Sequence, residues 1–94
     1  MRVVYGEFEW EDAKAATNVA KHGVTFEEAS TAFSDPYGVD APDLEHPGRF
    51  VLIGMSETLR VLFVVAAERR GHRIRIVSAR KATAGQRRLY EAKR

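Results

Sequence analysis

Residues 61–67, VLFVVAA, form the longest uncharged apolar run of the 94-residue chain. A strand with apolar side chains on both faces must be covered on both, so we predict that this run lies at the centre of a sheet. Segments rich in β-branched residues flank it at about residues 49–55 and 73–79, and short polar links join all three. This pattern predicts an antiparallel three-stranded meander whose central strand spans about residues 59–68.

The residues before the meander predict one strand, two helices and a loop. Residues 3–8 are predicted as a strand that ends at the acidic pair at positions 11 and 12. A helix follows over about residues 11–21, with Gly23 as its C-cap. A capping box at residues 25–28 opens a second helix that runs to about residue 33. Residues 34–48 hold all three prolines and are predicted as a loop.

A second capping box, Thr83 with Gln86, predicts a last helix after the meander. The order of elements is then strand, two helices, three strands and helix, which is an α+β arrangement. We therefore expect a single domain over residues 1–94, with a small antiparallel sheet of the N-terminal strand plus the three-stranded meander, two N-terminal helices and one C-terminal helix.

The composition excludes several kinds of site. The chain has no cysteine, which excludes a disulfide scaffold, a thiolate zinc site and a cysteine nucleophile. Its three histidines, His22, His46 and His72, lie on different predicted elements without paired spacing, so we expect neither a metal site nor a cofactor. No segment approaches the ~20 apolar residues that span a bilayer, and acidic residues follow the N-terminus too early for a signal peptide. We expect a soluble, cytoplasmic protein without a membrane partner.

The two halves of the chain differ strongly in charge. Residues 1–48 carry three Lys or Arg against ten Asp or Glu, a net charge of −7, and residues 49–94 carry twelve against three, a net charge of +9. Clustered positive charge attracts phosphate, so the basic half suggests a surface for a polyanion or for an acidic partner. The alternative is that the halves fold against each other and their charges largely cancel.

Arg80 is a candidate phosphate ligand because it stands at a predicted strand end, and Arg60 is a second candidate functional residue at the end of another strand. Strict alternation puts Arg73 and Arg75 on one face of the third meander strand, and Ile74, Ile76, Ser78 and Arg80 on the other. Arg80 would then end the strand on its packed face, where a guanidinium can face a cleft and bind phosphate oxygens. The alternative is a solvated edge strand with protective charges. Arg60 stands near the entrance of the central strand, where a charged head group also reaches water easily.

Tyr90 and the pair Lys21–His22 also allow two interpretations. Tyr90 on the last helix can stack a base or donate its hydroxyl, or it can be buried as the anchor of that helix. Lys21 can hold phosphate and His22 can move protons. The same two cations would alternatively satisfy the last carbonyls of the first helix.

Several blocks of the sequence, taken together, resemble the BrnT family of ribonuclease toxins. The most specific are KHGVTFEEA at residues 21–29 and SARKAT at residues 78–83, in that order. The similarity spans nearly the whole chain and also includes FEWE at 8–11, Lys14, Asn18, FSDP at 33–36, IGMS at 53–56, Arg60, residues 73–77 and the pair Tyr90–Glu91. In one departure, Leu59 stands where the family has glycine, so the hairpin before Arg60 is expected to differ.

The resemblance implies a RelE-like fold, in which helices pack on an antiparallel sheet whose open face holds the RNA. It also implies the toxin of a type II toxin–antitoxin system, a metal-independent endoribonuclease that cleaves RNA and inhibits translation. The implied partner is a BrnA-like ribbon-helix-helix antitoxin, which neutralises the toxin and brings the complex to operator DNA.

The resemblance further implies roles for individual side chains. Arg60 and Arg80 would stabilise the phosphate, Tyr90 would stack a base or transfer a proton, and His22 would be the acid or base. Lys21 and Lys81 would bind RNA. A non-catalytic module that binds nucleic acid or a partner with the same fold is the alternative function. Catalysis predicts that Arg60, Arg80 and Tyr90 surround one cleft, whereas scattered charges would favour binding alone.

Overall fold

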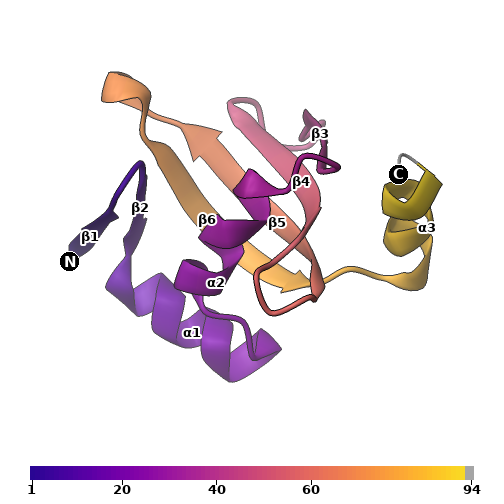
Figure 1. Cartoon of the computed structure of the whole chain (residues 1–94). Helices are drawn as coiled ribbons and strands as arrows, with labels where there is room; N and C mark the ends of the chain where they lie inside the picture. Colours follow the sequence, from indigo (N-terminus) through magenta and orange to yellow (C-terminus); the bar gives the residue numbers. More distant parts are fainter. Residues whose placement is uncertain (93–94) are drawn as a thin grey trace.

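A computed structural model describes residues 1–92, which form a six-stranded sheet with helices on both of its faces (Figure 1). In chain order the elements are β1 (Arg2–Tyr5), β2 (Phe8–Glu11), α1 (Asp12–His22), α2 (Phe26–Thr31), the 3₁₀ turn η1 (Ala32–Ser34), β3 (Val39–Pro42), β4 (Arg49–Met55), β5 (Val61–Glu68), the 3₁₀ turn η2 (Arg70–His72), β6 (Ile74–Lys81) and α3 (Ala84–Ala92). The α+β class and the positions of the three helices agree with the prediction. None of the helices in residues 1–92 has the length and apolar composition needed to cross a membrane.

The sheet has the strand order β1-β2-β6-β5-β4-β3, with the apolar strand β5 near its middle. Strands β4, β5 and β6 form the predicted antiparallel meander. The sheet as a whole is mixed, because β2 pairs in parallel with β6 through Phe8–Ile74 and Glu9–Arg75. The prediction of a small antiparallel sheet of four strands was therefore wrong in strand number and in the direction of this one pair.

The predicted N-terminal strand is a hairpin of two strands. β1 pairs antiparallel with β2, from Arg2–Glu11 to Tyr5–Phe8. Gly6 and Glu7 form the turn between them, and Gly6 has a φ of 59°, a conformation that glycine adopts without steric cost. A two-residue turn barely interrupts the apolar pattern, so the sequence showed one strand where there are two.

The predicted loop at residues 34–48 contains the short edge strand β3. It pairs antiparallel with β4, from Val39–Ile53 to Pro42–Phe50. Only its first residue is partly covered and the other three are exposed. A terminal proline is tolerated there because β3 lies at the sheet edge. A short exposed strand has no apolar alternation, which explains why its sequence is typical of a loop.

The two faces of the sheet carry separate apolar clusters. Helices α1 and α2 cover one face, which buries Trp10, Phe26 and Leu62 among others (Figure 1). On the other face α3 covers one end, where Tyr90 packs with Ile53 and Val61. Among the described residues no helix covers the remainder of this second face. We call that remainder the open face, and define it by Val65, Ala67, Arg75 and Ser78.

A β-bulge in β6 changes the faces on which its arginines lie. The register between β5 and β6 shifts at this point, and Val77 is the extra residue. Arg75, Ser78 and Arg80 consequently share one face, while Ile76 is buried on the helix-covered side. The alternation that separated Arg75 from Arg80 was wrong, because one inserted residue moves every later side chain to the opposite face.

The buried side chain of Asn18 joins α1 to the edge of β6. Asn18 Nδ2 donates to the carbonyl oxygen of Ala79 at 2.8 Å, and Asn18 Oδ1 accepts from the N–H of Ala79 at 3.1 Å. The same Nδ2 also donates to the carbonyl oxygen of Val24 at 2.9 Å. One amide thus pairs with β6 as a neighbouring strand would, and it fixes the turn that follows α1.

The predicted helix caps are present. The capping box at α2 has one of its two reciprocal hydrogen bonds, and the capping box at α3 has both. Thr25 Oγ1 accepts from the N–H of Glu28 at 3.0 Å, but the Glu28 carboxylate binds elsewhere. At α3, the N–H of Gln86 donates to Thr83 Oγ1 at 3.2 Å, and the N–H of Thr83 donates to Gln86 Oε1 at 2.9 Å. Gly23 caps α1 with a φ of 66°, as predicted.

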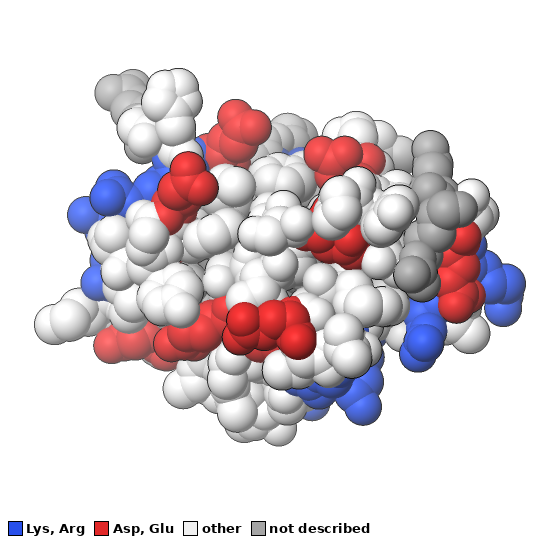
Figure 2. Space-filling model, viewed as in Figure 1, with Lys and Arg blue, Asp and Glu red and all other residues white. Residues whose placement is uncertain are grey.

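Ion pairs join the acidic N-terminal half to the basic C-terminal half. Arg60 pairs with Glu28, and Arg75 pairs with Glu9 at 2.9 Å and with Glu11 at 3.9 Å. The charges of the two halves therefore cancel in part. On the face seen in Figure 2, acidic side chains still lie across the middle, and basic side chains lie mainly at the edges.

The hairpin between β4 and β5 holds Leu59 in a left-handed conformation. The N–H of Leu59 donates to the carbonyl of Ser56 at 2.9 Å, and the N–H of Ser56 donates to the carbonyl of Arg60 at 2.8 Å. Leu59 has a φ of 66° and is 77% exposed. The hairpin was expected to differ where Leu59 replaces glycine, and this stays a prediction. Leu59 itself adopts the positive φ, at a steric cost of roughly 1–2 kcal/mol.

We predict that Asn18→Asp lowers the free energy of unfolding by about 2–4 kcal/mol. The carboxylate can still accept from Ala79, but it cannot donate, so two buried carbonyls lose their partner and face a negative charge. Urea unfolding followed by circular dichroism measures the loss. Ala16→Asp, at an exposed position of the same helix, is the control. Equal losses for the two variants would show that the Asn18 amide is dispensable.

We predict that Leu59→Gly raises the free energy of unfolding by about 0.5–1 kcal/mol. Glycine removes the steric cost of the positive φ, and the greater freedom of the unfolded chain offsets only part of this gain. Glu57→Gly, in the same turn but without positive φ, should be destabilising. Thermal unfolding of both variants and of wild type measures these effects. A melting temperature of Leu59→Gly below that of wild type contradicts the prediction.

Candidate functional site

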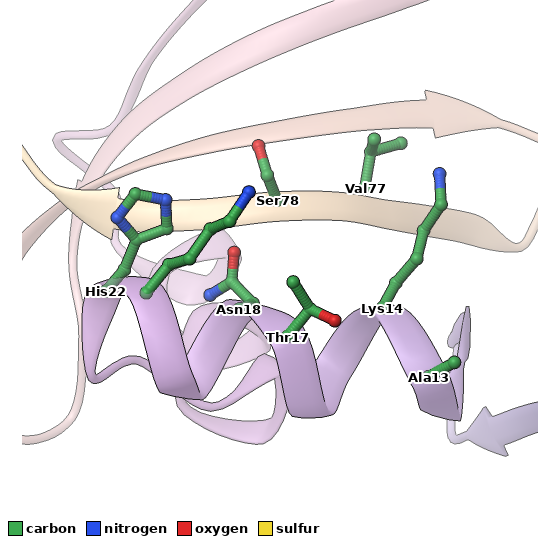
Figure 3. A pocket seen from close by; sticks show the side chains of 8 residues that line it. Ala13, Lys14, Thr17, Asn18, His22, Val77 and Ser78 are labelled. Carbon is green, nitrogen blue, oxygen red and sulfur yellow. The ribbon is translucent and has the colours of Figure 1, made fainter.

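A groove of about 350 Å³ lies between α1 and β6 (Figure 3). Lys14, Thr17, Lys21 and His22 of α1 line one side of it, and Ser78 of β6 lines the other. Thr17 follows Lys14 by three positions, Lys21 follows Thr17 by four, and His22 comes next. This spacing places the four residues on one side of the helix. In Figure 3 the side chains of Lys14 and His22 point from α1 toward β6.

Asn18 sets the width of this groove. Its bonds to Ala79 hold the middle of α1 at hydrogen-bonding distance from the strand edge. Lys14 lies one turn before Asn18 and His22 one turn after it, so both side chains are presented along the same edge. The groove therefore combines ammonium groups, an imidazole and a hydroxyl, which can bind an anion and move a proton.

Lys21 and His22 occupy the last turn of α1 and are exposed. Cations near the carbonyl end of a helix are electrostatically favourable, which agrees with the capping interpretation. Both side chains also line the groove, which agrees with the functional one. Within residues 1–92, no group of three or more His, Cys, Asp or Glu side chains is arranged to hold a metal ion.

Arg60, a predicted phosphate ligand, is held by Glu28 of α2. Its Nε donates to Glu28 Oε2 at 2.9 Å, and its Nη2 forms a second hydrogen bond to Glu28 Oε1. Nη2 also donates to the carbonyl of Gly23 at 3.1 Å. This two-point ion pair fastens the β4–β5 turn to the turn between α1 and α2.

Glu28 is the centre of that network. Its Oε2 also accepts hydrogen bonds from Ser56 Oγ at 2.7 Å and from Thr58 Oγ1 at 2.6 Å. The Glu28 side chain is only 13% exposed. The hydrogen bond from Arg60, followed by those from the two hydroxyls, lowers the pKa of Glu28 from 4.5 to about 2 despite the opposing effect of burial.

Tyr90 is buried, at 2% exposure. Its hydroxyl donates to Asp35 Oδ2 at 2.6 Å, and the same oxygen accepts from the N–H of Met55 at 2.8 Å. The tyrosine thus ties α3 to β4 and to the segment after η1. This is the arrangement of a helix anchor, and its role in stacking or proton transfer stays a prediction.

Arg80 lies over the ring of Phe63, with its guanidinium carbon 4.4 Å from the ring centroid. Its Nη1 donates to Gln86 Oε1 at 3.0 Å and to the carbonyl of Lys81 at 3.1 Å. The side chain is half-buried against the start of α3. Lys81 is exposed and lines a smaller pocket of about 190 Å³ together with Arg60 and Arg87.

The predicted residues therefore do not all line one pocket. Lys21 and His22 share the groove, and Arg60 and Lys81 share the smaller pocket. Arg80 lies over Phe63, which packs against the cluster that contains Tyr90, so these two side chains are on the same face, whereas Arg60 is bound to Glu28 of α2. A cleft shared by all three stays a prediction.

Sequence analysis assigned no role to Lys14, Thr17 or Ser78, which complete the groove. The spacing of seven residues between Lys14 and Lys21, which places both on one helix face, was the available signal. Ser78 carried no comparable signal, because its position depends on the bulge in β6.

We predict that Glu28→Gln lowers stability at pH 7 by roughly 3 kcal/mol and flattens its dependence on acid pH. A depressed carboxyl pKa contributes stability above about pH 4.5, which is lost as the pH falls toward 2. Urea unfolding at pH 7, 4.5 and 3 measures both effects. Glu27→Gln, one position earlier and exposed, should retain the wild-type profile; a wild-type profile for Glu28→Gln would contradict this account.

Comparison with known proteins connects this geometry to a family. Residues 10–85 match the family described as ribonuclease toxin, BrnT, of type II toxin-antitoxin system. Among solved structures the chain is similar to the ribonuclease toxin BrnT of Brucella abortus, with 25% sequence identity, a TM-score of 0.65, and coverage of 79% of this chain and 92% of that one. No curated protein matches the chain. The chain therefore belongs to the BrnT family of ribonuclease toxins of type II toxin–antitoxin systems.

Proposed function

We propose that this chain, as a single domain in the cytoplasm, cleaves RNA without a metal ion and holds the scissile phosphate in the groove between α1 and β6. The observation that supports this is the convergence of Lys14, Lys21 and His22 on the edge of β6. Phosphate is the anion of an RNA backbone, and ammonium groups bind it as point charges. An exposed imidazole beside the phosphate supplies the group that moves protons.

In this mechanism the ribose 2′-oxygen attacks the adjacent phosphorus and the bond from phosphorus to the 5′-oxygen breaks. The 2′-hydroxyl proton passes to a base, an acid returns a proton to the departing 5′-oxygen, and the products are a 2′,3′-cyclic phosphate and a 5′-hydroxyl. We assign His22 to one of these proton transfers. Lys14 and Lys21 stabilise the negative charge that grows on the phosphate oxygens.

The other predicted residues receive different parts in the proposal. Arg60, bound to Glu28 and to the carbonyl next to His22, is a positioning residue for the end of α1. Tyr90 positions α3 through Asp35. Arg80 and Lys81, which follow Ser78 along β6, would contact RNA beyond the groove. Direct contact of Arg60, Arg80 and Tyr90 with the reacting phosphate stays a prediction.

The antitoxin of this toxin is proposed to be a BrnA-like ribbon-helix-helix protein, as the sequence resemblance implies. It would neutralise the toxin, and operator DNA would be reached only through the complex of the two proteins.

A non-catalytic module for nucleic acid or a protein partner is the second candidate function. The existing contacts of Arg60 with Glu28 and of Tyr90 with Asp35 favour it, because side chains that are already bound are not free to act on a phosphate. The groove cations would bind RNA equally well without cutting it. Cleavage itself is therefore the measurement that distinguishes the two candidates.

We predict that purified toxin cleaves RNA in the presence of EDTA and leaves 2′,3′-cyclic phosphate ends, and that His22→Ala slows cleavage by about 10²–10⁴-fold. A time course on an end-labelled oligonucleotide gives the rates. His22→Lys separates chemistry from helix capping, because lysine keeps a cation at the end of α1 but replaces the imidazole. His46→Ala, at an exposed loop histidine paired with Asp43, is the matched control.

Loss of cleavage in both His22 variants, with folding intact by circular dichroism, supports proton transfer by His22. Full activity of His22→Lys would assign His22 to helix capping alone. If folded wild type binds the oligonucleotide and leaves it uncut, the binding module becomes the better function.

A further inference from the structure

A second basic hollow, separate from the groove, opens at the other end of β6. It has a volume of about 460 Å³ and is lined by Arg2, Glu9, Arg69 and Arg75. The four residues come from β1, from β2, from the turn after β5 and from β6, so the hollow forms only when the N-terminal hairpin pairs with the meander. All four lining residues are charged, and three are arginines.

The carboxylate of Glu9 neutralises only part of the positive charge of the three arginines. Its Oε2 accepts from Arg75 Nη1 at 2.9 Å, and its Oε1 lies 3.8 Å from Arg2 Nη1. Glu9 is buried, and the hydrogen bond from Arg75 lowers its pKa, so it is a fixed anion that holds Arg75 in place. Arg69 is exposed and has no ion pair among the described residues, and the Arg2 side chain is 60% exposed.

The hollow and the groove lie along the same strand. Arg75 lines the hollow, Ser78 lines the groove, and the bulge at Val77 puts both side chains on the open face. Three residues of a strand span about 10 Å. At a rise of ~3.4 Å per stacked nucleotide, that distance corresponds to about three nucleotides of one strand.

We propose that the Arg2–Arg69–Arg75 hollow is a second phosphate subsite, which binds the RNA backbone about three nucleotides from the scissile phosphate. This inference rests on the proposed function, because it takes the groove as the place of cleavage. Guanidinium groups match phosphate oxygens through paired N–H donors, and two of the three arginines here have no full counter-charge. Continuity with the groove along β6 favours a nucleic-acid strand over an acidic protein segment.

The test measures binding of a 2′-O-methyl RNA octanucleotide, which lacks the hydroxyl needed for cleavage. We expect Arg69→Ala and the double variant Arg2→Ala/Arg69→Ala to weaken binding, the double variant by roughly tenfold or more. Loss of one phosphate contact should also reduce the slope of log affinity against log salt by about 0.7. Arg88→Ala, an exposed arginine of α3, removes the same charge as Arg69→Ala and should leave affinity and slope near wild type.

Equal affinities and slopes for Arg69→Ala and Arg88→Ala would overturn the subsite. Normal RNA binding with reduced affinity for the co-expressed antitoxin in the double variant would also overturn it, and would assign the hollow to a protein partner. Failure of the proposed cleavage mechanism has a different signature. In that case RNA binding depends on Arg69 while wild type leaves a cleavable octanucleotide intact.

Discussion

The groove between α1 and β6 depends on one constraint, the pairing of the Asn18 side chain with the backbone of Ala79. Strand β6 pairs with β2 through only two residues, so most of its edge would otherwise expose unpaired backbone groups. An amide has two N–H donors and a separate oxygen acceptor, whereas a hydroxyl has one donor, a carboxylate has none and an ammonium has no acceptor. The backbone N–H and C=O of Ala79 are hydrogen-bonded by a side chain rather than by a neighbouring strand. This leaves room for a groove along that edge of β6.

A second polar cluster holds the end of the groove. Glu28 binds Arg60, and Arg60 binds the carbonyl of Gly23, the residue directly after His22. Asn18 bonds to the carbonyl of Val24, the next residue along. The turn after α1 is thus bound by two independent side chains, one from within the helix and one from the β4–β5 turn. Because the turn is held on both sides, the last turn of α1 can keep exposed cations without fraying.

Much of the fold followed from the sequence, because long apolar runs and capping residues report local structure directly. The meander, the three helices and the Thr83–Gln86 capping box were predictable for that reason. The bulge at Val77, the two-residue turn at Gly6 and the exposed strand β3 were not, since each depends on pairing with a distant segment. In the candidate site, Lys21 and His22 were singled out by their place at the end of the first helix and by the family resemblance, whereas the position of Ser78 depends on the bulge.

The arginines show why residue type alone could not assign the site. Arg60 and Arg75 each have a buried or half-buried carboxylate at hydrogen-bonding distance, which neutralises most of their field and fixes their position. Lys14 and Lys21 form no ion pair among the described residues, Arg69 acts on Glu9 only at longer range, and all three cations are exposed. A cation that already binds a carboxylate must give it up before it can bind a phosphate, whereas an unpaired cation loses only water. Only the folded chain shows the partner of each basic side chain. That partner distinguishes the cations that hold the fold together from those that, in the proposed function, are available to bind RNA.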